Sequence, residues 1–248
     1  MAKFAVIIAA AGQSRRFGCS DGKKTFVSLQ EKPVWLHSAI KFAGRADVIQ
    51  TIIVVSPEDE SEFRETNQQL LNQLGATVVA GGSERIDSVS NGLDAVQAGI
   101  DFVAIHDGAR PCVSAELIES LFDAAQMYEC VIPALPVTST VKRSTDGGKT
   151  VTQTVDRSQL FLAQTPQVFS RSVLVELFEK YFQSEAKISV TDEAQLVEHF
   201  GVEVRLMSGC PLNLKLTTRT DLKVAETFLQ HSQGVQFDAP IDPSTRIV

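Results

Sequence analysis

Apolar runs and amphipathic segments alternate along most of the chain. Uninterrupted apolar stretches at 4–9 and 51–55 leave no polar face, which predicts strands covered on both sides. Segments with helical apolar spacing lie between the strands, with Ser114 as a predicted N-cap and Gly75 as a predicted C-cap. The predicted strands are 4–9, 51–55, 77–80, 101–106, 130–134 and 203–207. The predicted helices are 33–42, 58–74, 114–126, 170–182, 191–200 and 220–231, with one more after Gly81-Gly82 and an extended piece at 214–217.

This alternation of strands and helices predicts right-handed crossovers and an α/β fold with a mostly parallel, Rossmann-like sheet. Residues 1–232 show no shift in composition that would separate two domains, so we expect a single domain. Residues 233–248 contain prolines and little apolar material, and we expect them to form an irregular tail.

The alternation breaks at 136–160, where two polar, β-prone segments flank Asp146-Gly147-Gly148. Glycines between β-prone segments predict a hairpin. The stretch holds too few large apolar residues to form a core of its own, which favours a projecting β-arm that packs on a second subunit. The alternative is a hairpin that lies loose on the surface.

Composition narrows the functional classes. Of the 248 residues, 44% are apolar and 21% charged, as in soluble globular proteins. The net charge of −7 argues against general binding to nucleic acid, which usually needs a basic face. The longest apolar run, 4–11, is too short to cross a membrane, and no signal-peptide cleavage pattern stands out. Four scattered cysteines without metal-ligand spacing favour reduced thiols, so we expect a cytoplasmic protein.

The stretch AAAGQSRRFG follows the first predicted strand. In open parallel sheets, ligands bind beyond the carboxyl ends of the strands. Ala10, Ala11 and Gly12 would let the backbone approach a ligand, with N–H groups facing anionic oxygens. Arg15 and Arg16 carry permanent charges that suit phosphate. The loop matches neither the Walker nor the dinucleotide-binding pattern, so it indicates a phosphate cradle or an ordinary turn with solvated arginines.

Two more loops leave predicted strand ends. Gly81-Gly82-Ser83 precedes a helix whose start offers unpaired N–H groups, and Ser88 either donates to a phosphate or sugar or is a routine helix residue. Asp107 ends an apolar strand, where a carboxylate needs a partner. That partner is either Mg²⁺ bound to phosphate oxygens or the nearby Arg110. His106 has no second histidine or cysteine at ligand spacing, which favours a structural role.

The stretches AAAGQSRRFG with Lys24, GGSERIDSV, HDGARP, PVTSTVK, TVDRSQL, AQTPQVF, VTDEA and LKLTTRTDL occur in this order from Phe4 to about Leu229. Together they resemble the 2-C-methyl-D-erythritol 4-phosphate cytidylyltransferase family of the non-mevalonate isoprenoid pathway. The resemblance implies a nucleotidyltransferase fold of the glycosyltransferase-A-like kind, a homodimer with exchanged arms, and a divalent metal, usually Mg²⁺. It also implies a reaction that joins the 4-phosphate of methylerythritol to the CMP part of CTP and releases pyrophosphate.

The resemblance carries over roles position by position. It implies that CTP is bound by Ala10, Ala11, Gly12, Gln13, Ser14, Arg15, Gly82, Ser83 and Ser88. It implies that the catalytic cations are Arg16, Lys24, Arg157 and Lys215. It implies that methylerythritol phosphate meets Asp107, Arg110, Thr140, Arg157, Thr165, Thr191 and Lys215, with Arg157 arriving on the partner's arm and Asp107 also binding the metal.

The chain departs from the family pattern at two places. The segment before Lys24 lacks the proline that often precedes this lysine, so Lys23 or Lys24 could contact phosphate; the following Thr-Phe favours Lys24. HDGARP has glycine where alanine is common. The alternatives are a cytidylyltransferase acting on ribitol 5-phosphate and a non-catalytic nucleotide-binding protein on the same fold. The predicted partners are CTP and a polyol phosphate, without nucleic acid or a membrane.

Overall fold

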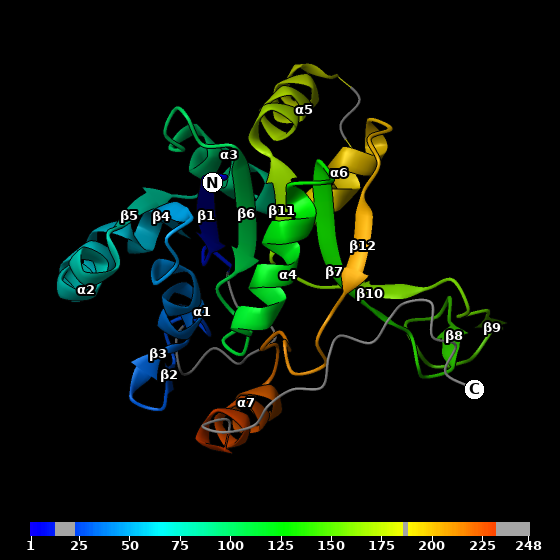
Figure 1. Ribbon diagram of the computed structural model, residues 1–248. Coiled ribbons are helices and arrows are strands. Elements are labelled where there is room, and N and C mark those ends of the chain that lie inside the picture. The colour runs from blue at the N-terminus through cyan, green and yellow to red at the C-terminus, as the bar shows by residue number, and fades with distance from the viewer. Residues whose placement is uncertain (13–22, 186–187, 232–248) are drawn as a thin grey trace.

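A central mixed sheet organises the molecule in the computed structural model, which describes residues 1–12, 23–185 and 188–231 (Figure 1). The strands run in the order β10-β7-β11-β6-β1-β4-β5, and β12 lies along β7. These strands are β1 (Phe4–Ala9), β4 (Val48–Val55), β5 (Ala76–Ala80), β6 (Phe102–Asp107), β7 (Cys130–Pro136), β10 (Phe161–Ala163), β11 (Gln167–Ser170) and β12 (Arg205–Ser208). The expected α/β fold with a mostly parallel sheet is confirmed.

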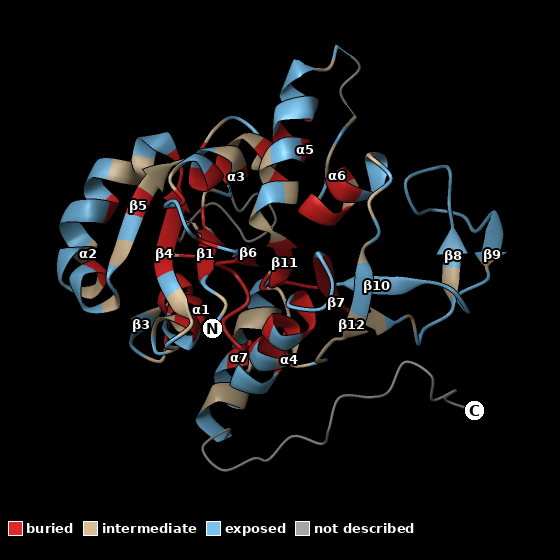
Figure 2. Ribbon diagram, turned by 45° about the horizontal axis from the view of Figure 1, so that its top comes forward, coloured by how far each residue is buried: buried red, intermediate tan, exposed pale blue. Residues whose placement is uncertain are grey.

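Helices cover both faces of the sheet. They are α1 (Val34–Ala43), α2 (Glu60–Leu74), α3 (Arg85–Asp94), α4 (Ala115–Ala125), α5 (Arg171–Gln183), α6 (Glu193–His199) and α7 (Arg219–His231). Alternate residues of β1 enter opposite cores: Val6 and Ile8 pack with α1, α2 and α4, whereas Ile7 packs with α3, α5 and α6. Because both faces are covered, β1 is a continuous apolar run, and Figure 2 shows it buried in the centre.

Local signals placed several helix ends correctly. Gly75 ends α2 with φ +60°, a left-handed conformation that a side chain would strain. The Ser114 hydroxyl accepts a hydrogen bond from the N–H of Leu117 at 3.1 Å and so caps α4. The extended piece predicted at 214–217 forms no strand, but the N–H of Leu216 donates to the Ala109 carbonyl at 2.8 Å. That bond brings a late segment of the chain beside the loop after β6.

The sequence did not predict β11. This strand runs antiparallel between β6 and β7, pairing with Phe102–Ile105 on one side and with Cys130 and Val131 on the other. β10 is also antiparallel and pairs with the end of β7. The sheet is therefore parallel on the side of β1, β4 and β5 and mixed around β7.

The predicted arm is a hairpin of its own, made of β8 (Val141–Arg143) and β9 (Gln153–Val155). Gly147 and Gly148 turn it with positive φ angles, and the Asp146 carboxylate accepts the N–H groups of Lys149 and Thr150 at 3.0 Å. The hairpin stands away from the central sheet beyond β10 and is mostly exposed (Figure 2). Its predicted hairpin form is confirmed, whereas its packing on a second subunit stays a prediction.

A small hairpin of β2 (Ser28–Leu29) and β3 (Lys32–Pro33) leads into α1, and a 3-10 turn, η1 (Pro57–Asp59), follows β4. No helix of the described chain is long and apolar enough to cross a membrane. The predicted tail, 233–248, lies outside the described residues.

Candidate active site

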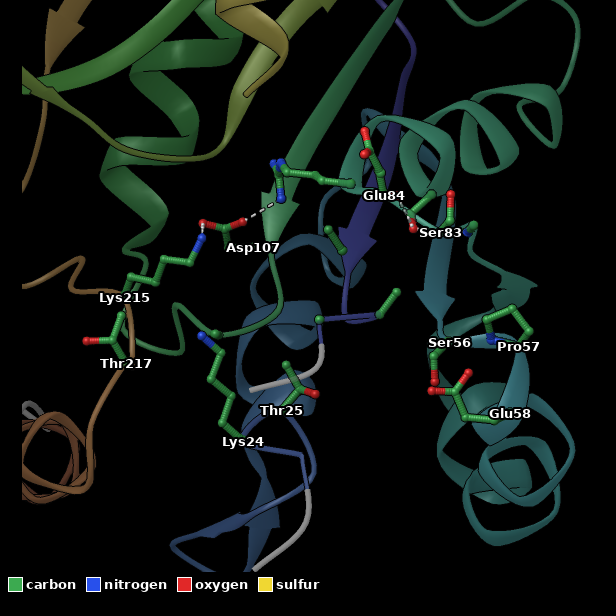
Figure 3. Close-up of a pocket in the computed structure, with 17 residues that line it drawn as sticks. Lys24, Thr25, Ser56, Pro57, Glu58, Ser83, Glu84, Asp107, Lys215 and Thr217 are labelled. Carbon is green, nitrogen blue, oxygen red and sulfur yellow. Dashed lines mark hydrogen bonds and ion pairs between the residues drawn. The ribbon is translucent and has the colours of Figure 1, made fainter. Parts of the chain in front are cut away.

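The cavity of interest, of about 710 Å³, opens beyond the carboxyl ends of β1, β4, β5 and β6. Its lining comes from loops that leave these strands and from a late segment before α7. The lining residues are Ala9, Ala11, Gly12, Lys24, Thr25, Ser56, Pro57, Glu58, Gly82, Ser83, Glu84, Arg85, Ser88, Asp107, Ala109, Lys215 and Thr217. Figure 3 shows Lys215 reaching Asp107 on one side, with Ser56, Pro57 and Glu58 on the opposite side.

Asp107 is the electrostatic centre of this cavity. Its Oδ1 accepts from Arg85 Nη1 at 2.9 Å. Its Oδ2 lies 3.2 Å from Arg110 Nε and 2.9 Å from Lys215 Nζ. The Asp107 side chain is 7% exposed, whereas that of Lys215 is 39% exposed and faces the cavity. Three cations from distant parts of the chain therefore share one buried carboxylate.

These cations decide the charge state of Asp107. Burial works to raise its pKa, but the charges of Arg85, Lys215 and Arg110 outweigh burial and hold the pKa far below its ordinary value. The carboxylate is therefore ionised throughout the physiological range and cannot serve as a general base near pH 7. With three cations facing it, this corner of the cavity attracts anions.

Residues that do not line the cavity fix the backbone of Asp107. Its N–H donates to Thr165 Oγ1 at 3.0 Å, and Thr165 Oγ1 lies 3.1 Å from His106 Nδ1. His106 Nε2 lies 3.2 Å from the Arg110 carbonyl, which can only accept. Nε2 is therefore the protonated ring nitrogen, and Nδ1 accepts from the Thr165 hydroxyl. His106 is structural, as expected, and Thr165 supports Asp107 without lining the cavity.

Hydrogen bonds through Asn213 hold the side chain of Arg110 in place. Its Nη1 donates to the Asn213 carbonyl at 2.7 Å, and Asn213 Nδ2 donates to the Thr165 carbonyl at 2.7 Å. Arg110 is buried and does not line the cavity, so its guanidinium acts on the cavity through Asp107.

Arg85 and Glu193 belong to the site, although sequence reasoning gave neither a role. Arg85 lines the cavity and bridges Asp107 to Glu193, whose Oε2 accepts from Arg85 Nη2 at 2.9 Å. Both lie inside stretches that carried the resemblance, GGSERIDSV and VTDEA. The burial of Glu193 would have singled it out, but no local pattern in the sequence predicts that burial.

The small-residue loop is only partly in the cavity. Ala11 and Gly12 line it. Ala10 is fully buried in the core, and its N–H donates to the Val54 carbonyl at 2.8 Å. The expectation that the Ala10 N–H faces CTP phosphates is therefore wrong, because that donor is already used to hold β1 against β4. Gln13, Ser14, Arg15 and Arg16 lie outside the described residues.

The glycine loop is built for close packing. A Cβ on Gly82 would stand 2.3 Å from the Asp87 Cβ, and one on Gly81 would stand 2.7 Å from Ser88 Oγ. Ser88 Oγ accepts the N–H of Gly82 at 3.1 Å and donates to the Glu84 carbonyl at 3.0 Å. Gly82, Ser83 and Ser88 all line the cavity. Ser88 also fixes the loop through its two hydrogen bonds.

Lys23 and Lys24 have different surroundings. Lys23 Nζ contacts Ser56 Oγ and lies 3.0 Å from Glu58 Oε1 and 2.5 Å from Asp59 Oδ2. Lys24 lines the cavity, and Figure 3 shows it on the side of Lys215. This placement favours Lys24 for phosphate, as the resemblance does.

Comparisons with known proteins identify the family to which the chain belongs. A family model of 2-C-methyl-D-erythritol 4-phosphate cytidylyltransferase matches residues 4–231. The chain belongs to this family. It is therefore a nucleotidyltransferase.

Similar proteins include a 2-C-methyl-D-erythritol 4-phosphate cytidylyltransferase from Bacillus cereus, which is 38% identical over 92% of this chain and 98% of that protein. A "bifunctional enzyme IspD/IspF" from Desulfotalea psychrophila is 41% identical over 92% of this chain, which spans 57% of that protein. A crystal structure of 4-diphosphocytidyl-2C-methyl-D-erythritol synthase from Anaerococcus prevotii superposes with a TM-score of 0.76 at 28% identity, covering 92% of this chain and 99% of that one.

Besides Arg110 and Thr165, three more residues that the cytidylyltransferase resemblance assigns to the second substrate do not line the cavity of the single chain: Thr140, Arg157 and Thr191. All three are exposed. Arg157 donates to the Thr138 carbonyl within the arm, and Thr191 Oγ1 donates to Gln195 Oε1 at 3.0 Å. Their assigned roles stay predictions.

The described residues do not fit a metal ion held by the protein alone. They contain no group of three or more histidine, cysteine, aspartate or glutamate side chains that could hold one. Asp107, the predicted ligand, already accepts from cations on both of its oxygens. A dication beside three positive charges would be repelled unless its ligands were mainly phosphate oxygens. The expectation of Asp107 as a ligand is therefore not supported by its present contacts.

Proposed function

We propose that the protein joins 2-C-methyl-D-erythritol 4-phosphate to the CMP part of CTP, forming 4-CDP-2-C-methyl-D-erythritol and pyrophosphate in isoprenoid precursor synthesis. The observation that carries this proposal is the cationic corner around Asp107 at the carboxyl edge of the sheet, in a chain of this family.

The chemistry needs little more than alignment and charge compensation. An oxygen of the methylerythritol phosphate, already an anion at neutral pH, attacks the α-phosphorus of CTP. A P–O bond forms there, and the bond to the β-phosphate breaks, with the electron pair leaving on pyrophosphate. No proton has to be removed from the nucleophile, so the site needs no general base. Fixed cations stabilise the charge that gathers on the α-phosphate oxygens.

The two substrates would occupy different parts of the cavity. We propose that CTP lies along Gly12, Gly82, Ser83 and Ser88, which line the cavity, and that its phosphates extend toward Lys24, on the side of Lys215. The polyol phosphate would lie toward Asp107 and Lys215. A carboxylate accepts from hydroxyl groups and a lysine attracts phosphate, so this pair suits a substrate that carries both.

A second copy of the chain would complete the polyol site. The arm, which exposes Val151, projects from the sheet, and the neighbouring edge exposes large apolar side chains on β10 and β12: Phe161, Leu162 and Leu206. Apolar groups gathered at one sheet edge favour burial against another surface. We therefore propose a homodimer in which Thr140 and Arg157 reach the cavity of the other copy.

A divalent ion belongs to the proposal as part of the nucleotide substrate, entering with the triphosphate, which supplies most of its oxygen ligands. Asp107 would share the ion only if Lys215 or Arg85 shifted from its oxygens. We also propose a cytoplasmic location, for which the free thiols of Cys112, Cys130 and Cys210 give support.

Incubation with CTP, Mg²⁺ and one polyol phosphate at a time tests the proposal, with pyrophosphate and the CDP product both measured. We expect turnover with methylerythritol phosphate and little with ribitol 5-phosphate. A clear preference for ribitol 5-phosphate would overturn the substrate assignment. Binding of CTP without product from either substrate would favour the non-catalytic alternative.

Single-residue variants test the cavity itself. Lys215→Ala should lower kcat by at least about a hundredfold, because it removes a cation that faces the reacting phosphates. Lys223→Ala is the matched control, since Lys223 is exposed on α7 away from the lining and should leave kcat unchanged. Equal turnover in the two variants would remove Lys215 from the mechanism.

Mixed dimers test the shared site. Lys24→Ala subunits and Arg157→Ala subunits should each be poorly active alone. If Arg157 acts in the other copy's cavity, mixing them creates one cavity with both residues intact, and part of the activity returns. Absence of recovery in dimers shown to have mixed would refute the exchange of arms.

A further inference from the structure

Glu193 is a buried carboxylate that the mechanism above does not use. It is the first residue of α6 and its side chain is 1% exposed. Oε2 accepts from Arg85, whereas Oε1 is buried and has no hydrogen-bond partner among the described residues. Burial of a charged group with half of its acceptors unsatisfied destabilises the folded chain. A neutral residue would avoid that cost, so the position suggests a function for the charge.

The turn that carries Glu193 is fixed independently of the cavity. Asp192 caps α6 by accepting the N–H of Gln195 at 3.0 Å. Gln167 of β11 clamps the same turn from both sides, donating to Asp192 Oδ2 at 2.8 Å and accepting the N–H of Ala194 at 3.0 Å. The Glu193 carboxylate is thus held in place by the sheet and not by Arg85 alone.

Arg85 lies between this fixed carboxylate and the reactive corner. One terminal nitrogen donates to Glu193 and the other to Asp107, each at 2.9 Å. The side chain is 26% exposed and lines the cavity, whereas Glu193 does not line it. Without Glu193, the guanidinium could turn both of its terminal nitrogens onto Asp107, in the paired geometry that arginine and carboxylate favour. Arg85 would then compete with Lys215 for Asp107.

We propose that Glu193 is a positioning residue for the nucleotidyl transfer: it holds Arg85 in place so that Asp107 remains shared with Lys215, which faces the substrate. The inference rests on the proposed function and names a group that acts only through Arg85. Asp107 and Glu193 together pair with the cations of Arg85, Arg110 and Lys215.

The consequence falls on the polyol phosphate more than on the nucleotide, because Asp107 and Lys215 lie on its side of the cavity. Glu193→Gln keeps the size of the side chain and removes its charge. We expect kcat/KM for methylerythritol phosphate to fall by at least about tenfold. The Kd of CTP, measured by calorimetry without the second substrate, should change less than about threefold.

Glu198→Gln is the matched control, since Glu198 is exposed on the same helix and should leave both quantities unchanged. Combination with Arg85→Gln gives the decisive measurement. If Glu193 acts through Arg85, Glu193→Gln has no further effect on kcat/KM in a chain that already carries Arg85→Gln. Independent, multiplicative losses would overturn the proposal, as would a Glu193→Gln enzyme indistinguishable from the Glu198→Gln control.

A purely structural role gives a different pattern. Loss of folded protein would lower kcat for all conditions and leave the KM of both substrates unchanged, so the substrate split and the melting temperature separate the two cases. If Glu193→Gln does not fold, Glu193→Asp takes its place, because the shorter side chain keeps the charge but holds it farther from Arg85. This variant should likewise lower kcat/KM for methylerythritol phosphate and leave the Kd of CTP nearly unchanged. Wild-type values of kcat/KM for Glu193→Asp would overturn the inference. A wild-type enzyme without cytidylyltransferase activity would instead refute the proposed function.

Discussion

Acidification from pH 8 to pH 5 should remove about 2 kcal/mol of folding stability through His106 alone. The ring is completely buried, between Thr165 Oγ1, the Arg110 carbonyl and the ring of Phe42, whose centroid lies 5.3 Å away. Burial lowers the pKa of His106 from 6.5 to about 4, because the charged imidazolium loses its hydration there and Arg110 and Lys215 add repulsion.

The sign follows from the two states of the chain. In the unfolded chain, His106 takes up a proton as the pH falls through about 6.5. In the folded chain it stays neutral until about pH 4. The neutral ring therefore contributes full stability above pH 6.5, and that stability is lost as the pH falls from 6.5 to 4. At about 1.4 kcal/mol per pH unit, the loss at pH 5 is about 2 kcal/mol.

Urea unfolding followed by tryptophan fluorescence measures this loss. Trp35 is the single tryptophan of the chain and is 1% exposed, so its emission reports the core. His106→Gln is the comparison variant, because its amide keeps one donor and one acceptor but does not titrate. At one fixed protein concentration, the wild type should lose about 2 kcal/mol more than the variant between pH 8 and pH 5. Equal losses in both proteins would refute the assignment of a neutral, buried His106.

Three further expectations follow from the site and the core. Lys24→Ala should lower kcat/KM by about a hundredfold or more, whereas Lys23→Ala should lower it by about tenfold at most, because the partners of Lys23 are acidic side chains at the rim. Steady-state assays compare the two variants, and a larger loss for Lys23→Ala would reverse the assignment. Gly82→Ala should lower the free energy of unfolding in urea by about 1–3 kcal/mol and raise the KM for CTP, because the added Cβ would stand 2.3 Å from a side-chain carbon of the next helix. Unchanged stability and KM would show that the loop can shift to accommodate the added methyl group. Burial raises the pKa of the Cys112 and Cys130 thiols to about 12. Both thiols should therefore react with iodoacetamide at pH 8 at least about a hundredfold more slowly in the folded protein than in urea. Mass spectrometry identifies the labelled positions, and rapid labelling of either thiol in the native state would contradict its burial.

Several elements could be predicted because their signals are local. The apolar run of β1, the glycine after α2 and the serine before α4 each act within a few residues, through burial on both faces, a left-handed backbone or a capped N–H. The arm was predicted for the same reason, from two glycines at its turn. β11 gave no such signal: it is short, and its place depends on pairing with β6 and β7, which lie far from it in sequence.

The candidate site divides in the same way. The sequence by itself determined the alternation of strands and helices, the loops of small residues at the strand ends, and the cations near them, because these depend on residue type and spacing. Only the tertiary structure decided which charges meet. It brought Arg85 and Lys215 to Asp107, buried Glu193 behind Arg85, turned Ala10 into the core and separated Lys24 from Lys23. Charges interact over a few ångströms of space whatever their separation along the chain, so their pairing is fixed only when the sheet has assembled.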